Sequence, residues 1–179
     1  AGIPAIEQLL FDGVNINVTL LFSIPAYEAV HEAYIRALTR RQEAGRPLGT
    51  VASVASFFLS RIDVLVDGLL AHRIDRTSAE PDGPAALFGT SAIASARLAY
   101  RGFETRVSQD DWQSLVAGGA RPQRLLWAST STKNPLYDPT MYVVPLVGPH
   151  TVNTMPEVTI DAFAAAGEIR PGAIREGVE

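Results

Sequence analysis

Residues Asn15–Phe22 read NINVTLLF, a short run of β-branched and apolar side chains that is typical of a strand buried on both faces. Patterns of helical spacing lie on both sides of this run. Before it, Ile3–Phe11 predicts a helix, and Gly13 follows where that helix would end. After it, Ser23 can cap a second helix, which Gly45 would close. The stretch therefore predicts a helix, a buried strand and a helix in succession.

The same alternation continues along the rest of the chain. Further strands are predicted at Val51–Phe58 (VASVASFF) and Arg124–Ser129 (RLLWAS). Tyr142–Val147 (YVVPLV) is a fourth candidate, although Pro145 inside it cannot donate a hydrogen bond to a neighbouring strand. Helical patterns separate the strands, and this order implies parallel strands joined by right-handed helical crossovers.

The region between the second and third strands carries further predictions. Ser60 and Asp63 form an S-x-x-D capping pair at the start of a helix. Thr77–Pro84 (TSAEPDGP) is a polar, turn-rich loop, and the alanine-rich Ala85–Tyr100 is predicted to be helical. The helix that starts near Ser60 is expected to bury a stripe of apolar side chains, namely Ile62, Leu65, Val66, Leu69 and Leu70.

The length of 179 residues limits the architecture. A complete barrel of eight strand–helix units needs about 250 residues, and three or four strands are roughly half of its sheet. An open doubly wound sheet would fit the length, but it normally presents a glycine-rich phosphate turn, and neither G-x-G-x-x-G nor G-K-[ST] occurs here. No internal repeat and no Pro-rich or Ser-rich linker is present. We therefore expect one domain or part of one.

Composition excludes several classes of protein. Hydrophobic residues make up 47% of the chain and charged residues 19%, which excludes global disorder. The net charge is −4 and the sequence has no basic stripe, which argues against a protein that binds nucleic acid. No apolar stretch is long enough to span a bilayer. Cysteine is absent and the three histidines are scattered, so we expect neither a disulfide nor a metal site. A cytoplasmic protein is the expectation.

Polar side chains mark the places where chemistry can occur. Asn17 and Thr19 interrupt the first strand and, being two residues apart, point to one face. Ser129–Asn134 (STSTKN) follows the third strand with hydroxyls, an ammonium and an amide, which suits a phosphate or a polyhydroxylated chain. For Asn17 and Thr19, the alternative is an internal hydrogen-bonded pair without a function. For Ser129–Asn134, the alternative is an ordinary solvated loop. Lys133, the only lysine among the fifteen Lys and Arg residues, could also be a Schiff-base nucleophile.

Four stretches taken together resemble transaldolase, in the bacterial subgroup that occurs alone or fused to glucose-6-phosphate isomerase. They are Ile3–Ser23 (IPAIEQLLFDGVNINVTLLFS), Val54–Asp63 (VASFFLSRID), Leu126–Tyr137 (LWASTSTKNPLY) and Thr151–Phe163 (TVNTMPEVTIDAF). The resemblance implies an α/β fold, a (β/α)8 TIM barrel of the class I aldolase type. Here it would be a partial barrel of about four strand–helix units. Residues 1–179 would be the C-terminal part of a single barrel domain.

The resemblance also implies an activity. Transaldolases transfer a dihydroxyacetone unit, converting sedoheptulose 7-phosphate and glyceraldehyde 3-phosphate to erythrose 4-phosphate and fructose 6-phosphate. The reaction belongs to carbohydrate metabolism in the pentose phosphate pathway, uses a lysine Schiff base and needs no cofactor. The partners expected are therefore sugar phosphates, not nucleic acid or a membrane.

Two residues of the first strand match the family's N-x-T motif. Asn17 corresponds to the asparagine that hydrogen-bonds the donor hydroxyls. Thr19 corresponds to the threonine that holds the catalytic water used in proton transfer. The resemblance therefore implies catalytic roles for both.

Five other residues are implied to bind substrate. Ser56, Phe58 and Arg61 match S-x-F-x-x-R, in which the serine contacts substrate, the phenylalanine lines the pocket and the arginine binds phosphate. Ser129 and Lys133 belong to the loop after the third strand. Lys133 occupies a position that is commonly Arg in relatives and is the second phosphate cation, so the charge is kept but the bidentate fork is lost.

The family's Schiff-base lysine has no counterpart in this chain. In the family it lies at the end of the strand that precedes the helix beginning here at Ile3. The chain also opens at Ala1 without Met. We therefore expect the later half of a barrel, with the N-terminal half missing and no activity of its own. The alternatives are a fragment that binds sugar phosphates without catalysis and an aldolase-like enzyme that uses Lys133 as nucleophile.

Overall fold

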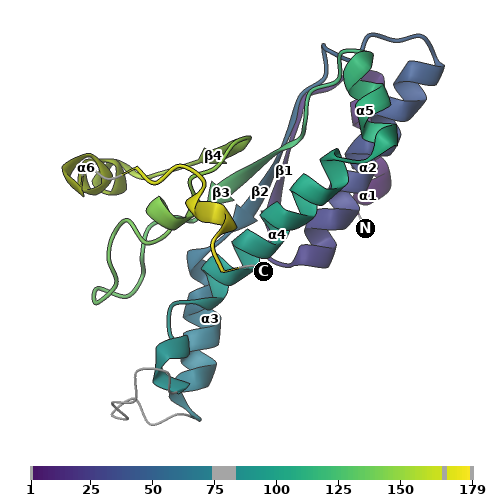
Figure 1. Cartoon of the computed structure of the whole chain (residues 1–179). Coiled ribbons are helices and arrows are strands. Elements are labelled where there is room, and N and C mark those ends of the chain that lie inside the picture. Colours follow the sequence, from purple (N-terminus) through teal and green to yellow (C-terminus); the bar gives the residue numbers. More distant parts are fainter. Residues whose placement is uncertain (1, 74–83, 167–168, 178–179) are drawn as a thin grey trace. The chain divides into compact units, whose positions relative to one another are not determined.

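The computed structural model describes residues 2–73, 84–166 and 169–177 and has an α/β fold (Figure 1). Strands alternate with helices, as the sequence predicts. In chain order the elements are α1 (Ile3–Asp12), β1 (Ile16–Leu21), α2 (Ile24–Glu43), β2 (Ser53–Phe58), α3 (Ser60–Ala71), η1 (Pro84–Leu87), α4 (Ser91–Val107), α5 (Asp110–Ala117), β3 (Arg124–Ala128), η2 (Val144–Leu146), β4 (Thr151–Asn153), α6 (Glu157–Ala166) and η3 (Ala173–Arg175). The elements labelled η are short 3₁₀ helices.

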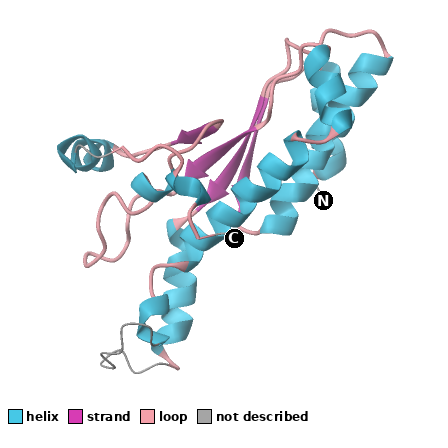
Figure 2. Ribbon diagram, in the orientation of Figure 1, coloured by secondary structure: helices cyan, strands magenta, loops and turns pink. Residues whose placement is uncertain are grey.

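The strands form one parallel sheet of four in the order β1-β2-β3-β4, so that each strand lies beside the one before it in the chain. They are labelled in Figure 1 and drawn in magenta in Figure 2. In the first pair, Ile16 is opposite Ser53 and Asn17 is opposite Val54. The register shifts between Val18 and Leu21. This topology is the one that short helical crossovers produce between parallel neighbours.

Local sequence signals account for the first three elements. Gly13 ends α1 with a φ of 97°, a left-handed conformation that glycine adopts without strain. Ser23 precedes α2, and its hydroxyl accepts a hydrogen bond from the backbone N–H of Ala26 at 3.4 Å. The predicted succession of helix, strand and helix is confirmed.

The described residues divide into two compact units. The first unit consists of the described residues within Ala1–Phe57, Ala99–Leu126 and His150–Val152. The second unit consists of the described residues within Phe58–Leu98, Trp127–Pro149 and Asn153–Glu179. In the first unit α1 packs against α2, and the core between the elements is apolar. Its buried members are Leu10, Tyr34, Ile35, Ala37, Leu38, Leu48, Val51, Trp112, Leu115 and Ala120.

The prediction of a fourth strand at Tyr142–Val147 is wrong. Val144–Leu146 forms a short 3₁₀ helix, and the fourth strand is Thr151–Asn153. Pro145 explains the difference, since it has no N–H for a strand ladder and its fixed φ suits a helical turn.

The prediction for the start of α3 is also wrong. Ser60 and Asp63 do not form a capping pair, because the Asp63 carboxylate accepts hydrogen bonds from other elements and lies 1% exposed. The predicted apolar stripe does not face inward either, since Leu65 is 65% and Leu69 56% exposed. The face of α3 that packs in the second unit is therefore its polar face.

Two predictions that follow α3 have different outcomes. The helix expected at Ala85–Tyr100 begins later, because Pro84–Leu87 forms a 3₁₀ helix and α4 starts at Ser91. Of the polar loop expected at Thr77–Pro84, residues 77–83 lie outside the part of the chain that the structure describes.

Candidate functional site

Two of the predicted residues contact one another across the first strand pair. The hydroxyl of Ser56, in β2, donates to Oδ1 of Asn17, in β1, at 2.6 Å. Ser56 is buried whereas Asn17 is exposed. The bond holds the Asn17 amide in one orientation, with Oδ1 toward β2. Its NH₂ group is then the part of the amide that can donate to a ligand.

Thr19 lies on β1 two residues after Asn17 and is exposed, while Val18 between them is buried. This alternation agrees with the prediction that Asn17 and Thr19 share a face. The next residue, Leu20, has a φ of 64° and is 56% exposed. A left-handed leucine costs about 1–2 kcal/mol, and such strain is found most often near functional sites.

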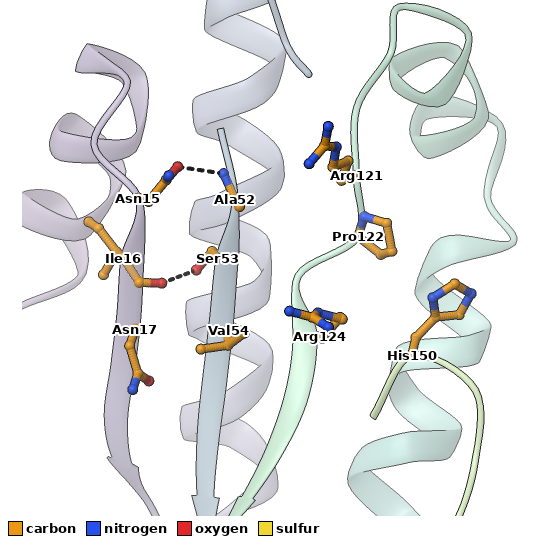
Figure 3. A pocket seen from close by; sticks show the side chains of 10 residues that line it. All are labelled: Asn15, Ile16, Asn17, Ala52, Ser53, Val54, Arg121, Pro122, Arg124 and His150. Carbon is orange, nitrogen blue, oxygen red and sulfur yellow. Dashed lines mark hydrogen bonds between the residues drawn. The ribbon is translucent and has the colours of Figure 1, made fainter. Parts of the chain in front are cut away.

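A cavity of about 600 Å³ opens in the first unit at the amino ends of the strands (Figure 3). Amide groups line one side, and basic side chains lie on the other. Its polar lining residues are Asn15, Asn17, Ser53, Arg121, Arg124 and His150. In parallel α/β folds, ligands bind at the carboxyl ends of strands. Asn17 is the predicted site residue that also lines this cavity. Because the cavity lies at the opposite ends of the strands, we assign the cavity itself no catalytic role.

In the second unit, Arg61 is held over an aromatic ring at the start of α3. Its guanidinium carbon lies 5.2 Å from the centroid of the Phe58 ring, which is a cation–π distance. Arg61 is exposed and occupies the second position of α3. The positive end of the helix dipole adds to its charge there, so this position favours an anion.

Ser129 ties the end of β3 to the start of α3. Its hydroxyl lies 2.8 Å from the hydroxyl of Ser60, and its carbonyl oxygen accepts from the Ser60 N–H at 3.0 Å. The preceding N–H, of Leu59, donates to the carbonyl oxygen of Ala128 at 3.0 Å. Ser129 adopts a φ of 56°. The loop that carries Lys133 therefore leaves β3 in a direction set by these contacts.

Lys133 is exposed and donates from Nζ to the hydroxyl of Ser131 at 2.8 Å. It also lines a second, smaller cavity of about 220 Å³ in the same unit. The other polar lining residues of that cavity are Ser60, Asp63, Asp67, Asn134, Tyr137 and Tyr142. An exposed ammonium beside hydroxyl groups suits an anionic ligand.

Sequence analysis did not single out the acid–tyrosine pairs of the second cavity. Tyr142 donates to the Asp63 carboxylate at 2.7 Å, and Tyr137 donates to the Asp67 carboxylate at 2.5 Å. The spacing of Asp63 and Asp67, four residues apart on one helix face, was the available signal. Their partners are 79 and 70 residues away along the chain, which no local pattern reveals.

Two features are absent from the part of the chain that the structure describes, a cluster of metal ligands and a membrane-spanning helix. Residues 2–73, 84–166 and 169–177 contain no group of three His, Asp or Glu side chains placed to hold a metal ion. Within the same residues, no helix combines the length and the apolar character that crossing a membrane requires.

Comparison with known proteins gives a consistent result. The sequence model of the family described as "Transaldolase/Fructose-6-phosphate aldolase" matches residues 1–178. A transaldolase of Parafrankia sp. is 51% identical over 172 residues, which are 96% of this chain and 45% of that protein. "Transaldolase 2" of Nostoc sp. is 48% identical over 172 residues, covering 94% of this chain and 45% of its own length. A transaldolase of Thermobifida fusca is 47% identical over 174 residues, covering 97% of this chain and 46% of its own length. The chain thus spans a little under half the length of these relatives.

Proposed function

Because this chain belongs to the transaldolase/fructose-6-phosphate aldolase family, we propose that it is the C-terminal part of a transaldolase barrel that transfers a dihydroxyacetone unit between sugar phosphates. The donor and acceptor are sedoheptulose 7-phosphate and glyceraldehyde 3-phosphate, and the products are erythrose 4-phosphate and fructose 6-phosphate. The observation that carries the proposal is the family match over residues 1–178. The parallel α/β fold and the share of each relative that is covered are compatible with four of the eight units of a single (β/α)8 domain.

The nucleophile of this reaction is a lysine upstream of Ala1, in the N-terminal half that completes the barrel. Its amine condenses with the ketone of the donor and releases water, and the imine then withdraws electrons from the carbon–carbon bond that breaks. No cofactor is required for this chemistry. The enzyme acts in the pentose phosphate pathway, in the cytoplasm.

Asn17 and Thr19 assist at the reacting end of the sugar. The Ser56 hydroxyl holds the Asn17 amide with its NH₂ available, which supports a hydrogen bond from that amide to a donor hydroxyl. Ser56 contacts substrate beside it. Thr19 is exposed, which supports a role in holding the water that relays protons.

Arg61 and Lys133 bind the phosphate group of the substrate. The Phe58 ring beneath Arg61 limits the orientations of the guanidinium and lines the pocket. Ser129 and its contact with Ser60 hold the start of the loop that carries Lys133. Two cations and a helix N-terminus offer charge-assisted hydrogen bonds to a dianion.

The position of Lys133 argues against its use as the Schiff-base nucleophile. A nucleophilic lysine needs an apolar surrounding or a neighbouring cation that favours the neutral amine. Lys133 is exposed and donates to a hydroxyl, which supports the phosphate role instead.

A chimaera tests the proposal. In the reconstituted enzyme, the part of the Parafrankia transaldolase that precedes the matched residues is fused to Ala1 of this chain. We expect transfer activity with fructose 6-phosphate and erythrose 4-phosphate, and borohydride in the presence of fructose 6-phosphate should trap an adduct on a lysine of the upstream part.

The chain without the upstream part is the matched control, and we expect no transfer activity and no adduct from it. Poor solubility is also expected, because strand edges without partners and exposed apolar faces favour aggregation. A stoichiometric adduct on Lys133 with transfer activity would refute the proposed location of the nucleophile. A reconstituted enzyme that is folded, binds fructose 6-phosphate and forms no adduct would favour a non-catalytic sugar-phosphate binder.

A further inference from the structure

The inward face of α3 in the second unit is unusually polar. Ser60, Asp63 and Asp67 recur at intervals of three and four residues, so they lie along one side of the helix. Asp63 and Ser60 are each 1% exposed, whereas Val64, the residue directly after Asp63, is 55% exposed. Burying a carboxylate costs free energy unless hydrogen bonds satisfy it. The donors that surround Asp63 and Asp67 therefore explain why this face can be polar.

Two different segments of the chain donate hydrogen bonds to the Asp63 carboxylate. Its Oδ2 accepts from the Tyr142 hydroxyl at 2.7 Å, and its Oδ1 accepts from the N–H of Ala92, in the first turn of α4, at 2.8 Å. Burial raises the pKa of Asp63, and both of these hydrogen bonds oppose the rise. Burial and the neighbouring Asp63 carboxylate raise the pKa of Tyr142, so the phenol keeps the proton it donates.

Asp67 repeats this arrangement one turn later. Its Oδ2 accepts from the Tyr137 hydroxyl at 2.5 Å, and its Oδ1 accepts from the N–H of Gly89 at 2.9 Å. Burial, followed by the bond to Asp67, raises the pKa of Tyr137 to about 12. A Cβ at Gly89 would lie 2.9 Å from Cζ of Tyr137, so the close approach of the ring requires glycine.

These contacts anchor the loop that carries Lys133. At its first end, the Ser129 and Ser60 hydroxyls lie 2.8 Å apart. At its other end, the N–H of Tyr137 donates to the Asn134 carbonyl at 3.1 Å, while Oδ1 of Asn134 accepts from the N–H of Leu136 at 3.0 Å. This tight turn directly follows Lys133. The loop is thus attached to α3 at both ends, and Arg61 lies on the same helix between Ser60 and Asp67.

We propose that Asp63 and Asp67 are positioning residues that, through Tyr142 and Tyr137, hold the Lys133 loop on α3 and so set the distance between the two phosphate cations, Lys133 and Arg61. The inference rests on the phosphate role in the proposed function. Neither acid touches substrate. Each holds a phenol: Tyr137 closes the turn that directly follows Lys133, and Tyr142 fixes the same segment of chain to α3 five residues further on.

Removal of one hydroxyl tests this role with little change in shape. In the reconstituted enzyme, Tyr137→Phe keeps the ring and deletes the bond to Asp67. We expect the KM for fructose 6-phosphate and the dissociation constant of inorganic phosphate each to rise about tenfold, the effect of one lost hydrogen bond. The kcat, and the kinetic constants with unphosphorylated fructose, should stay within about twofold of those of the unsubstituted enzyme, which is less than the loss of one hydrogen bond would cause.

Tyr34→Phe is the matched control. Its buried hydroxyl donates to the carbonyl of Arg121 at 2.7 Å in the first unit and has no part in the loop. It should lower stability as Tyr137→Phe does and leave both phosphate constants unchanged. Asp67→Asn leaves one amide oxygen for two donors, the Tyr137 hydroxyl and the Gly89 N–H, so its phosphate affinity should fall as that of Tyr137→Phe does.

The outcomes separate this inference from the proposed function. If the unsubstituted enzyme binds phosphate through Lys133 but transfers no sugar, the proposed function fails, and the phosphate constants of the variants still decide the positioning role. The positioning role is refuted if Tyr137→Phe weakens phosphorylated and plain sugars by the same factor. It is equally refuted if Tyr137→Phe matches Tyr34→Phe, or if phosphate binds independently of Lys133.

Discussion

Acid should destabilise the first unit through His31. This side chain in α2 is 2% exposed, its Nδ1 lies 3.2 Å from the Tyr27 hydroxyl, and its ring stacks on that of Phe103 with centroids 5.7 Å apart. Its Nε2 has no hydrogen-bond partner among the described residues. Burial lowers the pKa of His31 from 6.5 to about 4, with Glu32 opposing the shift and Arg106 adding to it.

The size of the effect follows from that pKa. The unfolded chain regains the ordinary value of 6.5, so between pH 6.5 and pH 4 the unfolded state binds a proton that the folded state does not. The free energy of unfolding therefore falls as the pH falls through this window, and above pH 6.5 the contribution is complete. A difference of about 2.5 pKa units corresponds to about 3 kcal/mol, a large share of the stability of an ordinary domain.

The assay is urea unfolding of the reconstituted enzyme across this pH window. His31→Phe keeps a ring beside Phe103 but cannot be protonated, so its free energy of unfolding should lose about 3 kcal/mol less on acidification than that of the unsubstituted enzyme. His72→Gln, at an exposed position after α3, is the control for the removal of an imidazole as such. Parallel curves for His31→Phe and the unsubstituted enzyme would show that the buried imidazole does not titrate as argued.

Three further outcomes are expected in the reconstituted enzyme. Arg61→Ala should weaken the binding of phosphorylated substrates by about 1.5–3 kcal/mol and that of fructose much less; an equal loss for both sugars, measured as KM, would contradict the phosphate role. Thr19→Ala should lower kcat roughly 10²–10⁴-fold with little change in KM, and a kcat that survives within a small factor would leave Thr19 a structural residue. Gly89→Ala should lower the Tm, because its Cβ would meet Tyr137 at 2.9 Å at a φ of +72°, whereas Gly68→Ala, with open space around it, should not.

Much of the fold could be predicted because its signals are local. The helix–strand–helix start was recognisable from NINVTLLF, from Gly13 and from the Ser23 cap, each of which acts within a few residues of itself. The fourth strand could not be predicted in this way. The apolar spacing of YVVPLV fits a strand, but Pro145 forms a 3₁₀ turn and the less apolar Thr151–Asn153 enters the sheet.

For the candidate site, sequence motifs identified the residue types but not their contacts. The alternation along β1 predicted that Asn17 and Thr19 share a face, and the burial pattern agrees. The Ser56 hydroxyl orients the Asn17 amide because the register of β1 and β2 brings these two residues together, although they are 39 positions apart in the chain. Periodicity within either strand does not specify this register.

The sequence by itself determined the positions of the first three strands and of the first two helices, the parallel α/β class and the motifs that resemble transaldolase. Only the tertiary structure decided which side chains of α3 are buried. An S-x-x-D pair and an apolar stripe predicted one orientation, yet Asp63 points to Tyr142 and Ala92 while Leu65 is exposed. The reason is that a buried carboxylate is stable only where donors surround it. Those donors come from segments 29 and 79 residues away, which folding alone brings together.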